Sequence, residues 1–268
     1  MKKCTDKGFY PVLRYLRILP LLIILQLILT DAASASDFKK GQLKYSRVRS
    51  AFAAKESKVR AKFEKAGVPW PPSNIFIRIF KAEETLELWA RAKSDTCYKK
   101  IEDYEICSSS GVLGPKRKQG DRQVPEGFYY IDRFNGNSKY HLSLGINYPN
   151  ASDKILGSRK KLGGDIFIHG ACVTIGCVPI TDSKIKELYI TAVEAKNAGQ
   201  ERIPVHIFPF RMSDKNLKSM QQQYKKHGEF WKNLKTGFDW FEKRRFIPQI
   251  RVDKNGFYTY MVSGAMED

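Results

Sequence analysis

The apolar residues of this chain change their spacing near residue 72, and this change limits the folds that are open to it. Over residues 40–66 they lie near one helical stripe, whereas over residues 75–80 isoleucine occupies every second position. A period of two is typical of a strand, and a period near 3.6 of a helix. Between the two patterns stand residues that end a helix and stiffen a linker: Gly67, Pro69, Pro71 and Pro72. The spacing predicts a basic helix and a Pro-rich linker over residues 36–72.

The middle of the chain is rich in strand patterns, and the flanks are helical. Residues 85–90 form a predicted hairpin with 75–80, and further strands are predicted over 97–107, 127–134, 139–146, 165–169 and 204–209. One helix begins at Thr181 or Asp182 and ends before Gly199. After Arg211 the pattern is helical to about Lys243, and a hairpin turns at 253–256. We therefore predict an α+β fold: a mostly-β core over residues 73–209, built of mixed or antiparallel sheets, with C-terminal helices and a hairpin over residues 210–268.

The first 35 residues have the features of an export signal. Basic residues up to Arg17 precede an apolar core over residues 18–29, and Ala33-Ser34-Ala35 forms an A-x-A cleavage pattern. The core is short for a membrane-spanning helix. We expect an exported mature chain without a transmembrane domain; an uncleaved signal that anchors the chain in the membrane is the alternative.

The charge of the chain is strongly positive. Lys and Arg number 47 against 28 Asp and Glu, so the formal net charge is +19. Such a chain attracts polyanions, which include nucleic acid, anionic lipid and acidic wall polymers. Because we expect export, we predict no nucleic acid partner.

The cysteines permit several pairings. Cys4 precedes the apolar core, and four others remain: Cys97, Cys107, Cys172 and Cys177. An even number in an exported protein suggests disulfides. Cys97 and Cys107 could be cross-strand partners or buried free thiols. Cys172 has a predicted structural role, and a bridge between it and Cys177 is a further possibility.

One segment brings a cysteine and a histidine together. A short buried strand ends at His169, a loop of small and β-branched residues follows, and Cys177 precedes a helix. A thiol is nucleophilic as thiolate, and an imidazole can take its proton and hold the resulting ion pair. Gly176 lets the chain turn so that N–H groups beside Cys177 face a carbonyl oxygen. A structural role for both residues is an alternative, and so is a zinc site of His169, Cys172 and Cys177, which would need a fourth ligand.

The same segment resembles the active-site signature of the L,D-transpeptidase (YkuD-type) catalytic domain family. Ile168-His169-Gly170 matches the His-Gly part, and Thr174-Ile175-Gly176-Cys177 matches Ser/Thr-x-Gly-Cys. The short spacing between them is similar to a YafK-like subgroup. Upstream, residues 124–129 resemble the element Thr-Pro-x-Gly-x-Phe/Tyr, with Val124 in place of Thr. The resemblance covers about residues 73–209.

Two positions depart from the pattern of the family. Pro179 stands where most members have Arg or Asn, and Ile175 stands where many have a second His. Both positions surround the reacting group. The acceptor specificity of ordinary transpeptidases is therefore not implied for this chain.

The resemblance implies a periplasmic, cysteine-dependent enzyme of peptidoglycan, with a role in cell wall biogenesis and cell shape. Cys177 would attack the carbonyl of meso-diaminopimelate in a stem peptide and form a thioester, with His169 as general base, and no metal or cofactor would be needed. An amine would then give transpeptidation. Water would give hydrolysis, as an L,D-carboxypeptidase or as an amidase that releases a wall-linked lipoprotein. A wall-binding module without catalysis is the third alternative.

The remaining site residues are also implied by the resemblance. Gly170, Thr174, Gly176 and Arg122 are expected at the substrate, with N–H groups near Gly176 and Cys177 as oxyanion donors. His169 is expected to be oriented by a backbone carbonyl. Candidate contacts for stem-peptide carboxylates are the basic loop residues Lys116, Arg117, Lys118, Arg122, Arg159, Lys160 and Lys161. His141 and His206 are interpreted as ordinary strand residues, and His227 as a surface residue.

Overall fold

The computed structural model describes residues 37–158 and 161–261. The predicted signal at 1–35 and the candidate contacts Arg159 and Lys160 lie outside the described residues. Within the described ranges, no helix is both long and apolar enough to cross a membrane.

The described chain contains helices at both flanks and strands in the middle. In chain order the elements are α2 (Ser46–Lys65), β1 (Asn74–Phe80), β2 (Thr85–Arg91), β3 (Lys99–Glu105), β4 (Gly127–Asn135), β5 (Ser143–Ile146), α3 (Ala151–Leu156), β6 (Phe167–His169), β7 (Val178–Pro179), α4 (Asp182–Asn197), β8 (Pro204–Phe208), α5 (Asp214–Gln223), η1 (Lys225–His227), α6 (Gly228–Arg244), β9 (Gln249–Val252) and β10 (Tyr258–Met261).

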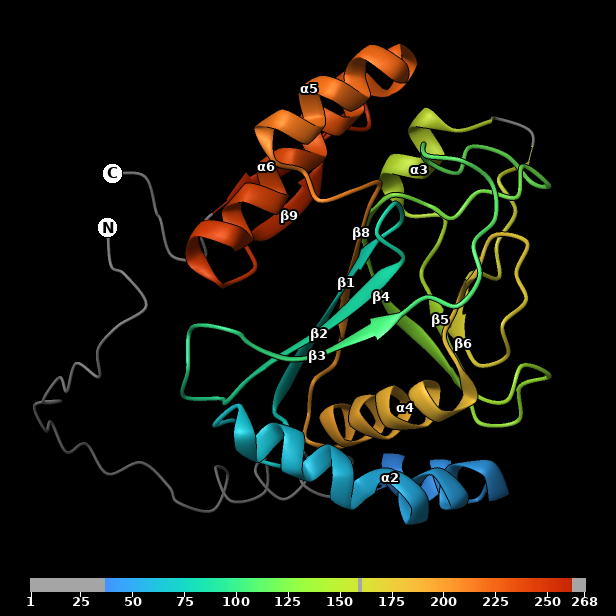
Figure 1. Cartoon of the computed structure of the whole chain (residues 1–268), viewed down its shortest axis with the longest axis vertical. Coiled ribbons are helices and arrows are strands. Elements are labelled where there is room, and N and C mark those ends of the chain that lie inside the picture. The colour runs from blue at the N-terminus through green and yellow to red at the C-terminus, as the bar shows by residue number, and fades with distance from the viewer. Residues whose placement is uncertain (1–36, 159–160, 262–268) are drawn as a thin grey trace, which may run out of the picture.

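Eight strands form one mixed sheet in the order β3-β2-β1-β8-β4-β5-β6-β7 (Figure 1). The β1–β8 and β6–β7 pairs are parallel, and the other pairs of this sheet are antiparallel. β9 and β10 form a separate hairpin. The predicted α+β fold, with a mixed sheet and one helix after Cys177, is confirmed.

Both faces of the central strand β1 are buried. Ile75, Ile77 and Ile79 belong to the same hydrophobic cluster as residues of α2 and α4. Phe76 and Phe80, which point to the other face, pack against residues of α6. Figure 1 shows α2 and α4 together on one side of the sheet, with α5 and α6 on the other. The apolar residues on both faces of β1 thus reflect a sheet that is covered on both sides.

A buried ion pair joins the C-terminal helix α6 to the sheet. Arg78 of β1 is 1% exposed, and its Nη1 lies 2.7 Å from Oε1 of Glu242 in α6. The same nitrogen lies 3.4 Å from Oε2 of Glu87 in β2. A buried charge is tolerated when it is paired in this way. The C-terminal region, as far as it is described (residues 210–261), is therefore joined to the core through α6.

Several predicted elements differ in extent. The strand predicted over 139–146 is only Ser143–Ile146, because His141 adopts a φ of +68° that a strand does not accommodate. His141 thus lies in a turn, which corrects its interpretation as a strand residue. The short helix α3 begins with a capping box at Asn150 and Asp153, which the sequence analysis missed. The predicted helix after Arg211 is divided into α5, η1 and α6.

Candidate active site

Strand β6 sets the position and the tautomer of His169. Ile168 points into the core, so Phe167 and His169 lie on the opposite face of the strand. The Nδ1 atom of His169 lies 2.5 Å from the carbonyl oxygen of Gly170. Because a carbonyl oxygen only accepts, Nδ1 carries the proton, and Nε2 is left as the basic nitrogen. The expected orientation by a backbone carbonyl is confirmed.

The imidazole of His169 is shielded from water. The residue is only 2% exposed, and the ring of Tyr140 lies over it with 4.8 Å between centroids. Burial lowers the pKa of His169, and the Gly170 carbonyl opposes this in part. The ring is therefore neutral at neutral pH, which suits a general base.

Cys177 enters β7 beside β6. Its Sγ lies 3.6 Å from the carbonyl oxygen of Asp165. Burial raises the pKa of the thiol; the Phe167 N–H opposes this, the Asp165 carboxylate adds to it, and Lys116 lowers it slightly. The thiol is therefore protonated at neutral pH in the free protein.

The predicted thiolate–imidazolium pair is wrong for this resting state. Within the described ranges, the thiol and the imidazole each bond to a backbone carbonyl and not to each other. His169 pairs with Pro179 in the parallel register, so Cys177 lies two residues back along the neighbouring strand. This offset puts the two Cα atoms about 8 Å apart, within reach of side chains that turn toward one another. The structure thus holds a neutral thiol close to a neutral base.

Thr174 organises the loop that leads to the nucleophile. Its Oγ1 accepts hydrogen bonds from the N–H groups of Cys177 at 2.8 Å and Gly176 at 3.2 Å. The same hydroxyl donates to the carbonyl oxygen of Cys177 at 2.9 Å. The N–H groups expected to serve as oxyanion donors are therefore occupied by this hydroxyl.

Two glycines of the motif are required by their surroundings. Gly176 has a φ of +131°, and a Cβ there would lie 3.2 Å from the carbonyl oxygen of Gln123. At Gly170 a Cβ would lie 2.5 Å from Oδ1 of Asp182, the residue that opens α4. The same Oδ1 accepts the Ala171 N–H at 2.8 Å. These contacts fix both ends of the loop over residues 170–176.

The structure pairs Cys107 with Cys172, with 5.4 Å between their Cα atoms. The possible Cys97–Cys107 and Cys172–Cys177 bridges are therefore wrong. The seven extended residues of β3 (Lys99–Glu105) lie between Cys97 and Cys107 and span roughly 23 Å. Among the described cysteines Cys177 is the free thiol, and the zinc alternative loses Cys172 as a ligand. The bridge fastens the end of β3 to the loop before the nucleophile.

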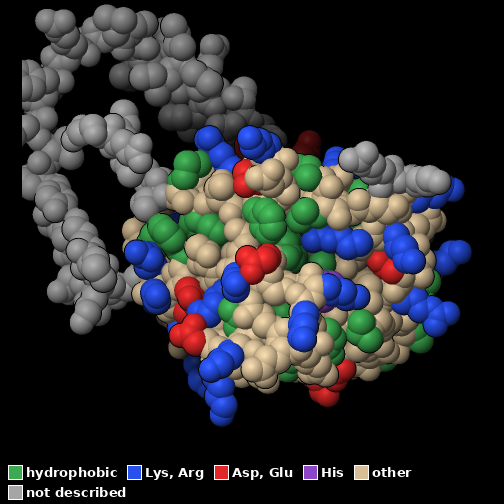
Figure 2. All heavy atoms as spheres, turned by 90° about the horizontal axis from the view of Figure 1, so that it is seen from above, with side chains coloured by type: hydrophobic (Ala, Val, Ile, Leu, Met, Phe, Trp, Pro, Cys, Tyr) green, Lys and Arg blue, Asp and Glu red, His purple; other side chains and the backbone are tan. Residues whose placement is uncertain are grey.

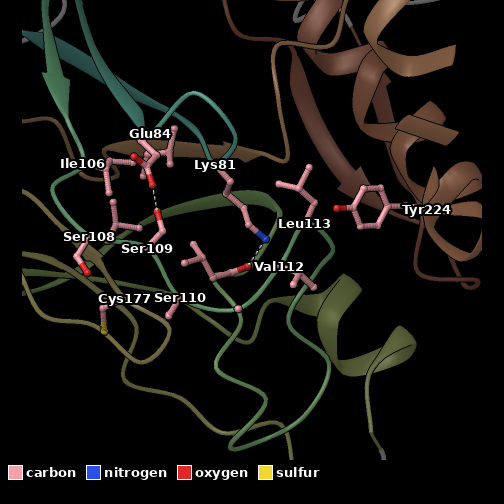
Figure 3. Close-up of a pocket in the computed structure, with 14 residues that line it drawn as sticks. Lys81, Glu84, Ile106, Ser108, Ser109, Ser110, Val112, Leu113, Cys177 and Tyr224 are labelled. Atoms are coloured by element: carbon pink, nitrogen blue, oxygen red, sulfur yellow. Dashed lines mark hydrogen bonds between the residues drawn. The ribbon is translucent and has the colours of Figure 1, made fainter. Parts of the chain in front are cut away.

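Cys177 also lines a pocket of about 260 Å³. Figure 3 shows the serine-rich loop 108–111 on one side of it and Tyr224, from the C-terminal region, on the other. The walls are mostly apolar, and the hydroxyl of Ser109 donates to Glu84 at 2.6 Å. The Nζ of Lys81 is used by three acceptors, among them Glu126 at 2.8 Å. The pocket is thus an amphipathic space beside the sulfur.

Glu126 was missed as an organising residue, although it lies within the motif at 124–129. It is fully buried, and its carboxylate also accepts the N–H of Gly114 at 2.7 Å and Nε1 of Trp231 at 2.8 Å. The sequence did offer one signal for this role, a glutamate in the middle of the motif, because a glutamate is rarely buried unless it is paired. The motif therefore anchors both a pocket wall and α6.

The basic residues predicted to contact stem-peptide carboxylates are dispersed. Lys116 pairs with Asp121 at 2.6 Å and Arg117 with Asp153 at 3.1 Å, so both have structural partners. Arg122 is exposed, its carbonyl accepts the Ser110 hydroxyl at 3.0 Å, and it is not among the residues that line the pocket. Figure 2 shows basic side chains scattered over the face seen from above. The structure therefore gathers no cluster of these candidates around Cys177 in the described ranges.

The rim of the site is apolar. Seven large hydrophobic side chains are exposed in the described part of the chain, and four of them surround the catalytic pair: Val112, Tyr140, Val173 and Ile175. Val112 lines the pocket with Cys177, and the last two belong to the loop before it. Exposed apolar groups that gather around a cavity indicate a binding surface.

Comparisons with known proteins agree with the motif. The sequence profile of the YkuD family, described as the L,D-transpeptidase catalytic domain, matches residues 74–207. The protein named "Putative L,D-transpeptidase YafK" from Escherichia coli K12 is 40% identical over 188 residues, which is 69% of this chain and 73% of that protein.

Solved structures show a weaker likeness. The helical cell shape determining protein Pgp2 from Campylobacter jejuni is 16% identical with a TM-score of 0.41, over 73% of this chain and 80% of that one. Bd1075 from Bdellovibrio bacteriovorus is 24% identical with a TM-score of 0.37. That match covers 64% of this chain and 61% of that one.

Proposed function

Because the chain belongs to the YkuD family of L,D-transpeptidase catalytic domains, we propose that it is an exported cysteine enzyme of peptidoglycan. Cys177 attacks the carbonyl carbon of diaminopimelate in a stem peptide. The observation that carries this proposal is a free thiol that opens into a pocket, two residues along the neighbouring strand from a histidine with a basic Nε2. The family assignment supplies the substrate class, and the geometry supports the chemistry.

The first half of the reaction forms a thioester. The thiol turns from the Asp165 carbonyl toward His169, and Nε2 takes its proton while sulfur bonds to the carbonyl carbon. The carbonyl π electrons move to oxygen and form an oxyanion. When the intermediate collapses, the C–N bond breaks and His169 returns the proton to the leaving amine. The acyl group is then on Cys177, and His169 is neutral again.

The oxyanion needs hydrogen-bond donors, and in the free protein the donors of the loop are already bonded to a side chain. The N–H groups of Gly176 and Cys177 point at the Thr174 hydroxyl. Hydrogen bonds to an anionic oxygen are stronger than those to a hydroxyl. The oxyanion therefore displaces the hydroxyl from these two donors, which were oriented before the substrate arrived.

The second half depends on what attacks the thioester. His169 activates either an amine, which gives a cross-link, or water, which gives trimming or release of a linked lipoprotein. Pro179 offers no side-chain donor at the position opposite His169. Because nothing there selects an amine, the hydrolytic variant is the alternative to transpeptidation.

The test uses the purified mature chain and defined muropeptides, analysed by mass spectrometry. Wild type should convert tetrapeptide, dimer or lipoprotein-linked substrates, and the intact protein should gain the mass of one acyl group. Cys177→Ala should abolish both signals while circular dichroism stays unchanged. His169→Gln should slow acylation by at least about 100-fold. Turnover by Cys177→Ala would disprove the proposal, and binding without acylation would favour the wall-binding module.

A further inference from the structure

Arg133 lies in a row of residues that crosses the sheet to the nucleophile. It pairs with Gly145 of β5, and Gly145 pairs with Phe167 of β6. The β6–β7 register then continues to Cys177, whose thiol lies at the Phe167 N–H. Paired residues of a sheet face the same side. Arg133 is therefore on the His169 face, three strand spacings from Cys177, or about 14 Å between Cα atoms.

The side chain of Arg133 covers much of that distance. Its guanidinium lies over the ring of Phe167, 4.8 Å from the centroid. Gly145 makes this possible, because a Cβ there would lie 3.0 Å from Nε and 3.1 Å from Cβ of Arg133. Gly145 is not among the glycines with positive φ, so the space above it is what favours glycine. The cation thus reaches across β5 to Phe167 of β6, the residue in register with Cys177.

A carboxylate already occupies the end of this guanidinium. Nη1 of Arg133 lies 2.7 Å from Oδ1 of Asp165, whose side chain is 81% exposed. The carbonyl oxygen of the same Asp165 accepts the Cys177 thiol. Exposed ion pairs are weak, so another carboxylate can replace this one at little cost.

We propose that Arg133 binds a carboxylate of the stem peptide when the diaminopimelate carbonyl lies at Cys177, and that Asp165 occupies its place in the free protein. This inference rests on the proposed function. A guanidinium forms two parallel hydrogen bonds with a carboxylate, and the ring of Phe167 holds its plane. Stem peptides offer three such groups: the α-carboxylate of D-glutamate, the second carboxylate of diaminopimelate and the terminal carboxylate of D-alanine.

The test combines enzyme variants with substrate analogues. Steady-state kinetics are measured on a tetrapeptide muropeptide and on three analogues, each with one of these carboxylates amidated. The enzymes are wild type, Arg133→Gln, Arg133→Lys and Arg60→Gln. Arg60 is the control, because it is also cationic and exposed, and it lies on α2, where it is 4.0 Å from Glu56. Equal melting temperatures verify that the fold is kept.

Arg133→Gln should raise KM about 10-fold or more with kcat nearly unchanged, which is the loss expected for a charged hydrogen-bonded pair. Arg133→Lys should be intermediate, and Arg60→Gln should behave as wild type. For one amidated analogue, the KM of wild type should be raised, and Arg133→Gln should not raise it further. The carboxylate that is amidated in this analogue is then the one that Arg133 binds. Asp165→Asn should lower KM about 2- to 3-fold because it removes the carboxylate paired with Nη1, while Asp132, 3.2 Å from Nε, stays in place.

Two results would overturn the inference and leave the proposed function intact. One is an active wild type whose kinetics are matched by Arg133→Gln on every substrate. The other is a rise in KM on amidation that is the same in Arg133→Gln as in wild type for each of the three analogues. Absence of turnover and of Cys177 acylation in wild type would contradict the proposed function, and the inference with it.

Discussion

The catalytic pair is held as two neutral groups, although many cysteine catalysts store an ion pair. A free cysteine has a pKa of about 8.5, and burial raises the pKa of Cys177 above its usual value. Burial also lowers the pKa of His169. Both shifts disfavour charge separation in the free protein. In the reaction proposed above, the proton would therefore move during the attack and not before it.

The alkylation rate of Cys177 should report this directly. Since only the thiolate reacts, the rate of labelling by iodoacetamide should rise with pH to a midpoint above about 8.5. Asp165→Asn should lower that midpoint, because it removes a negative charge that raises the pKa of the thiol. Rates are measured from pH 6 to 11 by intact mass, with Cys177→Ala to subtract other thiols. A midpoint below about 7 would instead show a stored thiolate–imidazolium pair.

The elements around the site are tied together by residues far apart in the sequence. The Cys107–Cys172 bridge spans 65 positions and joins the end of β3 to the loop that carries Thr174. A bridge across so long a segment restricts the unfolded chain strongly. It also fixes the start of the loop whose N–H groups at Gly176 and Cys177 are bonded to the Thr174 hydroxyl. Stability and catalytic geometry thus depend on the same bond.

Replacing both cysteines should separate these two effects. The double variant Cys107→Ser/Cys172→Ser should lose about 4 kcal/mol of unfolding free energy, measured by urea denaturation under non-reducing conditions. At a temperature where it is still folded, kcat should fall because the loop is less ordered, while the alkylation midpoint of Cys177 should change little. Unchanged stability would mean that the bridge does not persist in solution.

Elements with a local signal were predictable, and those made by long-range pairing were not. The alternation in β1 and β2 and the apolar face of α4 placed these elements within a residue or two of their bounds. The two-residue strand β7 has no pattern of its own and exists because β6 pairs with it. The Cys107–Cys172 pairing was missed for a related reason: spacing along the chain does not show that the end of β3 lies near residue 172.

At the scale of the whole molecule, the C-terminal region and the family domain share a hydrophobic cluster, in which Phe80 and Phe208 of the sheet join Trp231 of α6. Trp231 is fully buried, and its Nε1 donates to Glu126, which lies within the motif at 124–129. Tyr224 lines the pocket that contains Cys177. The motif at 124–129 was recognised from the sequence, but the packing of its glutamate against a helix 105 residues later required the three-dimensional structure. The pKa shifts of Cys177 and His169 also required the three-dimensional structure, because burial causes them.

The contribution of the Trp231–Glu126 hydrogen bond to the free energy of unfolding can be measured with substitutions at two tryptophans of α6. Trp231→Phe removes a donor to the buried Glu126 and should cost about 1–3 kcal/mol beyond the lost ring area. Trp240→Phe is the control, because its buried Nε1 has no hydrogen-bond partner among the described residues. Urea denaturation of both variants gives the comparison. Equal losses would show that the Trp231–Glu126 hydrogen bond contributes nothing to stability.

The two borders of the eight-stranded sheet have a consequence for aggregation. One border is β7, where Pro179 lacks an N–H and its carbonyl accepts the Cys107 N–H at 3.1 Å. The other is β3, where five of seven residues are charged. Proline and charged side chains at edge strands oppose the addition of further strands. The sheet can therefore carry Cys177 next to one of its borders without offering that border for fibril-like growth.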